Sequence, residues 1–280
     1  MSSVPRSPRP DLVAMHWRSA LVLAIVSAVG LVAFGWPLFT DPGSALDTSH
    51  SADAPWLFVL LLPLLAAIVL AELTEGGLDA KSVAVLGLLA SVGAALRALG
   101  PGTAGLEPSF LVVLLGGRVF GRGFGFVLGA LTVFAGALVT GGVGPWLPFQ
   151  MFGLAWVGFL AGCLPAARGR TEIWLLAAFA LVAGLAYGLL INLWFWPFAS
   201  YAPELSYVAG DPLADNLHRY LVFWLTTSLG WDVPRGVLTM LLVLFAGRPV
   251  LAALRRGARR AAFDVPVEFE PRPATEVSRS

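Results

Sequence analysis

Eight apolar segments recur along this chain and constrain its fold more than any other feature. A helix that crosses the ~30 Å hydrocarbon layer of a bilayer needs about 20 mostly apolar residues. Segments near that length, in a chain with 58% hydrophobic and 12% charged residues, predict an all-α, multi-pass transmembrane bundle. The expected spans are residues 18–38, 56–72, 82–99, 108–120, 123–141, 149–166, 173–197 and 232–252. The span 108–120 is short, so it needs tilt, a thinner bilayer or cover from neighbouring helices.

Basic residues indicate how these spans are oriented. Fifteen of the 18 Lys and Arg residues fall on one side of the predicted topology, whereas the opposite loops are acidic. Because cytoplasmic loops carry the excess of Lys and Arg, we expect a cell-membrane protein with both termini in the cytoplasm. A cleaved signal peptide is the alternative for the first span. The segment from Arg18 to Phe39 is too long for a signal core and lacks a small-residue cleavage site, which favours an anchor.

Polar stretches divide the chain into four predicted parts. Residues 1–17 form a cytoplasmic N-terminal segment, 18–79 a two-helix membrane extension, 80–256 a six-helix core, and 257–280 a flexible cytoplasmic tail. The pairs Arg255-Arg256 and Arg259-Arg260 directly follow the last span. We therefore expect them to contact anionic lipid headgroups, and we predict no nucleic-acid partner.

The composition excludes several kinds of active site. Cys163 is the only cysteine, and the three histidines, at positions 16, 50 and 218, lack the spacing of zinc ligands. No phosphate-binding loop occurs and Lys81 is the only lysine, which excludes ATP hydrolysis by that route. We predict no catalytic residue, no metal site and no cofactor. A membrane enzyme acting on lipid-linked substrates is an alternative, for which Asp232 and Arg235 supply the only close acid–base pair.

Polar side chains within the spans point to a binding site, because each is costly in lipid unless it is paired or hydrated. In the predicted topology, polar residues from four helices meet at the outer leaflet. They are Arg97, Gln150, Asn192, Asp232 and Arg235, and the aromatic residues expected to line the pocket with them are Trp146, Phe149, Trp194, Trp196, Trp224 and Trp231. Together they predict a small-molecule site that faces outward. An aromatic belt, a snorkelling arginine or a helix cap would explain any one of them equally well.

Small residues at four-residue spacing predict where helices approach one another closely. Such pairs are Gly125–Gly129, Gly158–Gly162, Gly184–Gly188 and Ala90–Ala94. Packing within the chain is the favoured interpretation, and docking of another subunit is the alternative. Residues 217–230 carry apolar side chains at helical spacing and predict an outer helix, which either covers the pocket as a lid or lies in the membrane interface.

Two motifs resemble those of the substrate-binding S components of energy-coupling factor (ECF) vitamin transporters. They are Thr140-Gly-Gly-Val-Gly-Pro-Trp-Leu-Pro-Phe-Gln-Met, followed by the glycine-rich segment from Gly153 to Pro165, and Ser228-Leu-Gly-Trp-Asp. The similarity covers residues 80–256 and implies a six-helix protein that captures a vitamin outside the cell. It also implies a transmembrane coupling subunit and two cytoplasmic ATPase subunits as partners, with Ala90 and Ala94 at the coupling subunit. The two spans before the core depart from this pattern.

The resemblance also suggests a ligand and a mechanism. A loaded S component topples in the bilayer so that its pocket reaches the cytoplasmic side. The motifs are most similar to those of S components for cobalamin-type corrinoids, and an aromatic pocket with amides suits a large, mostly neutral ring system. A smaller heterocycle, such as a thiamine pyrimidine precursor, would use the same residues in a tighter cavity. A membrane scaffold subunit without a ligand is the other alternative.

Overall fold

The computed structural model describes residues 17–35, 38, 80–100, 103–198 and 201–261. The predicted second span, 56–72, the linker before the core and most of the tail lie outside the described residues. The elements are α1 (Trp17–Gly35), α3 (Ala80–Leu99), a 3-10 turn η2 (Thr103–Gly105), α4 (Ser109–Phe120), α5 (Arg122–Thr140), α6 (Leu147–Cys163), α7 (Gly169–Phe195), a 3-10 turn η3 (Trp196–Phe198), α8 (Leu213–Phe223), a π turn η4 (Trp224–Ser228) and α9 (Leu229–Ala261).

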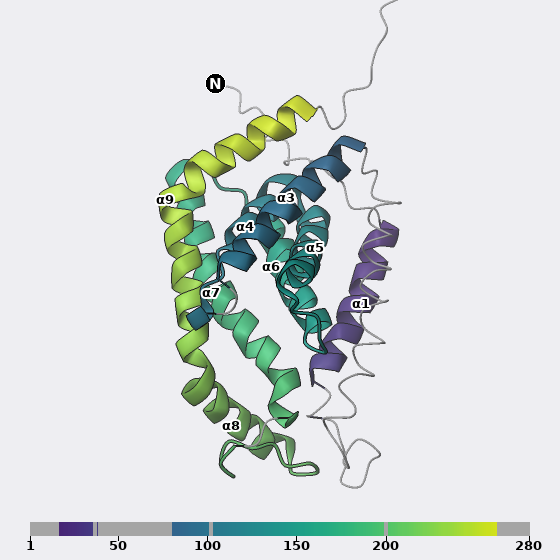
Figure 1. Ribbon diagram of the computed structural model, residues 1–280, viewed down its shortest axis with the longest axis vertical. Coiled ribbons are helices and arrows are strands. Elements are labelled where there is room, and N and C mark those ends of the chain that lie inside the picture. Colours follow the sequence, from purple (N-terminus) through teal and green to yellow (C-terminus); the bar gives the residue numbers. More distant parts are fainter. Residues whose placement is uncertain (1–16, 36–37, 39–79, 101–102, 199–200, 262–280) are drawn as a thin grey trace, which may run out of the picture.

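The described helices confirm the prediction of an all-α membrane bundle. Four stretches are long and apolar enough to cross a bilayer, namely Lys81–Leu99, Arg122–Thr140, Gly169–Phe198 and Leu213–Arg259. Shorter apolar helices occupy Leu23–Gly35, Ser109–Phe120 and Leu147–Cys163. In Figure 1, α1, α7 and α9 run along the long axis of the molecule, and α4, α5 and α6 lie between them.

Helix α4, which corresponds to the short predicted span 108–120, lies inside the bundle. Its 12 residues rise about 18 Å, well short of the hydrocarbon thickness. Phe110, Val113, Leu114 and Leu115 are fully buried, and α3, α5, α6 and α9 all contact this helix. Cover from neighbouring helices therefore allows a helix of this length to sit at membrane depth.

Glycines let neighbouring helices approach until their backbones touch. A Cβ atom added to Gly158 of α6 would overlap the carbonyl oxygen of Gly125 in α5, and one added to Gly129 would overlap the backbone of α6. Helices α7 and α9 meet in the same way at Gly184 and Gly236. These contacts confirm that the predicted small-residue pairs on α5, α6 and α7 pack within the chain.

The Ala90–Ala94 face of α3 also packs inward. The two side chains are 5% and 3% exposed, and Gly93 between them lies against Thr132 of α5. The exposed face of α3 is therefore not the Ala90–Ala94 face, which the resemblance places at the coupling subunit.

Helices α8 and α9 form one continuous helix through the π turn η4. The sequence predicts a separate outer helix at 217–230 and a span at 232–252, but the structure joins them without a loop. Pro234 and Pro249 lie inside α9, and a proline bends a helix because it lacks a backbone N–H. Figure 1 shows this helix along one side of the molecule, with its last turns bending across the end.

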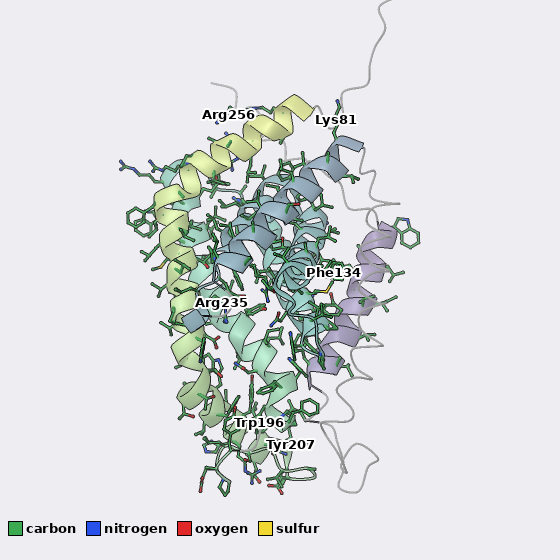
Figure 2. The ribbon with its side chains drawn as sticks, in the orientation of Figure 1. Lys81, Phe134, Trp196, Tyr207, Arg235 and Arg256 are labelled. Carbon is green, nitrogen blue, oxygen red and sulfur yellow. The ribbon has the colours of Figure 1, made fainter. Side chains whose placement is uncertain are left out.

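A second, smaller hydrophobic core closes the end of the molecule that lies away from Lys81 and Arg256 (Figure 2). Trp196, Tyr220 and Phe223 are buried there, with Tyr207 against the Trp196 ring. The Trp196 indole N–H donates to the Leu205 carbonyl at 2.6 Å. This core holds the loop before α8 onto the ends of α7 and α8.

Helix α1 packs on the six-helix core at α6 and α7. Trp156 Nε1 donates to Ser27 Oγ at 3.0 Å, and the buried ring of Phe34 meets Phe149 edge to face at 4.9 Å. The first part of the N-terminal extension is thus bound to the core by specific contacts.

Candidate functional site

Glu107 lies at the centre of a polar cluster inside the bundle, and a tight turn places it there. Ala104 and Gly105 in η2 both have positive φ, 50° and 73°. A Cβ atom on Gly105 would overlap the carbonyl oxygen of Trp231, so only glycine permits this approach to α9. The turn brings the carboxylate of Glu107 between α3 and α9.

Two arginines from distant helices bind this carboxylate. Arg97 Nη1, in the last turn of α3, donates to Glu107 Oε1 at 2.9 Å, and Arg235 Nε, in α9, donates to Oε2 at 2.9 Å. The exposed fractions of the three side chains are 14%, 12% and 8% for Arg97, Arg235 and Glu107. Arg235 Nη1 also donates to Asp232 Oδ1 at 2.6 Å. The cluster is therefore neutral overall, with two arginines and two carboxylates.

Asp232 is held from two further sides. Trp224, the first residue of the π turn, donates from Nε1 to Asp232 Oδ2 at 2.8 Å. Gly188 of α7 faces the carboxylate, and a Cβ atom there would overlap it. Because π turns reposition side chains along a helix and recur at functional sites, η4 accounts for the alignment of Trp224 with Asp232.

A cavity of about 280 Å³ opens beside this cluster. It is lined by Arg97, Glu107, Ala137, Thr140, Gly142, Trp146, Gln150, Tyr187, Ile191 and Arg235. Gln150 Oε1 accepts a hydrogen bond from Arg97 Nη2 at 2.5 Å. Trp146 is exposed, and its indole N–H donates to Gly142 at 3.1 Å. The Tyr187 ring lies 5.0 Å from the Arg235 guanidinium, a distance typical of cation–π contacts.

The arrangement suits recognition of a small polar molecule. The arginines and carboxylates form hydrogen bonds with one another and can exchange some of these for bonds to a ligand, while Trp146 offers a face for stacking. Among the described residues, no group of three His, Cys, Asp or Glu side chains is placed to hold a metal ion.

Comparison with known proteins identifies the family. The family model described as "ECF transporter, substrate-specific component" matches residues 81–246, more than half of the chain. The chain belongs to this family. No curated protein and no solved structure matches it. As an S component, the protein is a membrane subunit that provides substrate specificity to a transporter and associates with coupling and ATPase subunits.

The structure brings together most of the residues that the sequence singles out in this S component. Arg97, Trp146, Gln150 and Arg235 line the cavity, Asp232 binds Arg235, and Trp224 binds Asp232. Phe149 and Trp194 stack in parallel with their ring centroids 4.6 Å apart. Both are buried and neither lines the cavity, so they support the end of α6 that carries Gln150.

Three predicted residues neither line the cavity nor support the residues that do. Asn192 Nδ2 donates to the Gly188 carbonyl in its own helix at 2.8 Å. Trp196 belongs to the second, smaller hydrophobic core, and Trp231 is exposed at the surface. The position of a residue along a helix predicts the level at which it lies, but it does not predict the direction in which its side chain points.

Sequence reasoning misses Glu107 and Tyr187. It places Glu107 in an acidic outer loop. The charges within and next to the predicted spans nevertheless indicate its role. Arg97 and Arg235 carry two positive charges there, and Asp232 neutralises only one of them. Glu107 follows Arg97 by ten residues and is the nearest acid along the chain. Tyr187 is a phenol in an otherwise apolar helix, which is a weaker signal.

Proposed function

We propose that this S component captures a small vitamin or vitamin precursor outside the cell, in the cavity beside Glu107. The observation that carries the proposal is the neutral cluster of Arg97, Glu107, Asp232 and Arg235, which borders a cavity among membrane-spanning helices. Charged side chains at such depth are costly and mark binding sites or transport paths. The coupling and ATPase subunits would then supply the energy for uptake.

The size of the cavity favours the smaller of the two predicted ligand classes. Pockets for drug-sized ligands measure about 300–1,000 Å³, and this cavity, at about 280 Å³, lies just below that range. A corrinoid is many times larger than a single heterocycle. A compact heterocycle of the size of a thiamine pyrimidine precursor therefore fits better, and the neutrality of the cluster favours a ligand of small net charge.

Native mass spectrometry tests this proposal directly. The full-length protein would be extracted in mild detergent from cells grown with B vitamins and cobalamin, and examined for a retained small molecule. A mass matching a single heterocyclic compound supports the proposal. A corrinoid mass overturns the ligand class, and folded protein without any retained molecule favours the scaffold interpretation.

Substituting Gln150 should weaken ligand retention. Gln150→Leu removes an amide that lines the cavity and leaves Arg97 Nη2 without its acceptor. A hydrogen bond to a charged group contributes about 1.5–3 kcal/mol. The variant should therefore bind the ligand about ten- to hundredfold more weakly, and a smaller fraction of the purified protein should retain it. Asn192→Leu is the matched control, since that amide bonds within α7 and does not line the cavity. Equal losses in both variants would contradict the assignment.

The exposed side of α3 is the surface that we assign to the coupling subunit. Because Ala90 and Ala94 are buried, the small residues left on the surface of this helix are Ala84, Gly87, Ser91 and Ala95. Gly87 has no atom within 4 Å of the place where a Cβ would lie. Small faces of this kind let helices of two subunits approach closely in lipid.

A large side chain at Gly87 should block assembly without harming the fold. In Gly87→Trp, the indole would project from α3 and hold a partner helix away. Co-purification with the coupling and ATPase subunits should fall at least tenfold, while the melting temperature of the isolated protein stays unchanged. Gly230→Trp, at an equally open position on α9, should assemble normally. Normal assembly of Gly87→Trp would rule out this face.

A further inference from the structure

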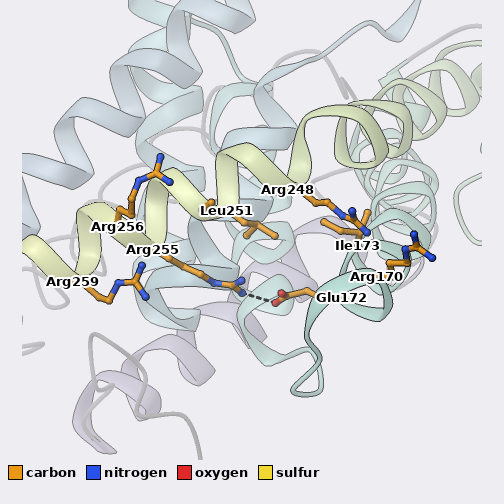
Figure 3. Close-up of a pocket in the computed structure, with 10 residues that line it drawn as sticks. Arg170, Glu172, Ile173, Arg248, Leu251, Arg255, Arg256 and Arg259 are labelled. Carbon is orange, nitrogen blue, oxygen red and sulfur yellow. Dashed lines mark hydrogen bonds and ion pairs between the residues drawn. The ribbon is translucent and has the colours of Figure 1, made fainter.

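Five arginines surround a second hollow (Figure 3). Figure 2 shows one of them, Arg256, at the end of the molecule opposite Trp196 and the second hydrophobic core. The hollow measures about 570 Å³ and lies between the start of α7 and the end of α9. It is lined by Gly169, Arg170, Glu172, Ile173, Arg248, Leu251, Ala252, Arg255, Arg256 and Arg259. It does not overlap the cavity beside Glu107, with which it shares no residue.

The only carboxylate in this hollow is already neutralised. Glu172, 2% exposed, accepts from Arg255 Nη2 at 2.7 Å and from Arg118 Nε at 2.9 Å. Arg118 also donates to the carbonyls of Leu164 and Pro165 at the end of α6. These bonds tie α4, α6, α7 and α9 together and fix Arg255 at the edge of the hollow.

The remaining four arginines have no acidic partner within the described part of the chain. They are Arg170, Arg248, Arg256 and Arg259. Arg248, Arg255 and Arg259 follow one another at spacings of seven and four residues, so they share one side of α9. The first turn of α7, whose free backbone N–H groups favour anions, borders the same space. The hollow is strongly positive and is built to hold an anion.

The position of the hollow indicates the kind of anion. It lies at the ends of two helices long and apolar enough to cross a bilayer, Gly169–Phe198 and Leu213–Arg259, and hence at headgroup depth. Ile173, Leu251 and Ala252 give it an apolar wall beside the guanidinium groups. Trp174, largely exposed next to Ile173, is the type of side chain that favours the membrane interface. A ligand with an anionic head and an apolar body matches all of these features.

We infer that this hollow binds the phosphate headgroup of an anionic phospholipid, with the positive charge of Arg170, Arg248, Arg256 and Arg259 attracting the phosphate and with Ile173 and Leu251 contacting the glycerol and upper acyl region. Arginine is well suited to this role because its planar fork pairs with two phosphate oxygens. This site is separate from the substrate cavity, and the inference does not rest on the identity of the substrate.

Lipid binding to the full-length, detergent-purified protein would test the inference. Native mass spectrometry would measure the apparent affinity for phosphatidylglycerol and for phosphatidylcholine in the wild type and in Arg248→Gln/Arg259→Gln. We expect the wild type to prefer phosphatidylglycerol and the double variant to bind it at least about tenfold more weakly, since each arginine near an anionic surface adds about fivefold. Binding of phosphatidylcholine should not change.

Arg122→Gln/Arg168→Gln is the matched control. It removes two exposed arginines at the starts of α5 and α7, outside the hollow, and therefore changes the net charge by the same amount. The control should retain the affinity of the wild type. An equal loss of affinity for phosphatidylglycerol in the control would show that the lipid is attracted by the net charge alone. Displacement of the lipid by inorganic phosphate at equal concentration would show that the hollow binds a free anion. Either result, or no lipid preference in the wild type, overturns the inference.

Discussion

Glu107→Gln is expected to lower the melting temperature of the detergent-solubilised protein by roughly 10 °C. Glutamine keeps the shape of the side chain but leaves Arg97 and Arg235 with one carboxylate between them, that of Asp232. Breaking a buried ion pair costs about 3–5 kcal/mol because a charge stays uncompensated, and about 1 kcal/mol shifts the melting temperature by 2–4 °C in a domain of similar size. Tryptophan fluorescence during heating would measure the change.

Two further variants show whether charge pairing causes the loss. Glu204→Gln makes the same substitution at an exposed position outside the cluster and should leave the melting temperature unchanged. Arg97→Gln/Glu107→Gln removes one charge of each sign and leaves Arg235 paired with Asp232, so it should be more stable than Glu107→Gln alone. A double variant no more stable than Glu107→Gln alone would contradict the ion-pair interpretation.

Gly158→Leu should destabilise the fold by about 3 kcal/mol or more. A side chain at this position would overlap the carbonyl oxygen of Gly125, and backbone cannot move aside as a side chain can. Over-packing of an ordinary core already costs about 1–3 kcal/mol. Helices α5 and α6 would have to separate, and we expect a melting temperature roughly 10 °C lower, together with aggregation on size-exclusion chromatography.

Gly87→Leu supplies the comparison for this prediction. It introduces the same side chain into a helix at a position where nothing lies within 4 Å. Exposed substitutions of this kind change stability by less than about 0.5 kcal/mol. If Gly158→Leu and Gly87→Leu had the same melting temperature, the close contact of α5 with α6 would not be a source of stability.

The membrane class, the spans of the core and the convergence of Arg97, Gln150 and Arg235 all follow from the sequence. They follow because lipid imposes simple rules: apolar length sets the spans, and polar side chains within them must meet a partner or water. The same rules explain the glycine contacts, since small residues at four-residue spacing bring backbones together.

Features that depend on direction around a helix are not predictable in this way. Ala90 and Ala94 fit a docking motif by spacing, yet their face of α3 turns toward α5. Asn192 lies at the expected depth but bonds to its own helix. Glu107 reaches the site through a turn with two positive φ angles, and its place in an acidic loop hides this role. Tertiary packing decides each of these cases.

The unbroken helix from α8 through α9 has a mechanical consequence. Its 47 residues from Leu213 to Arg259 have a contour length of about 70 Å, more than twice the ~30 Å thickness of the hydrocarbon layer. Asp232 and Arg235 lie partway along it, and Arg255, Arg256 and Arg259 lie near its end. This one helix therefore connects the polar cluster with the arginines at its end, so any tilt of the helix moves Asp232 and Arg235 at the same time.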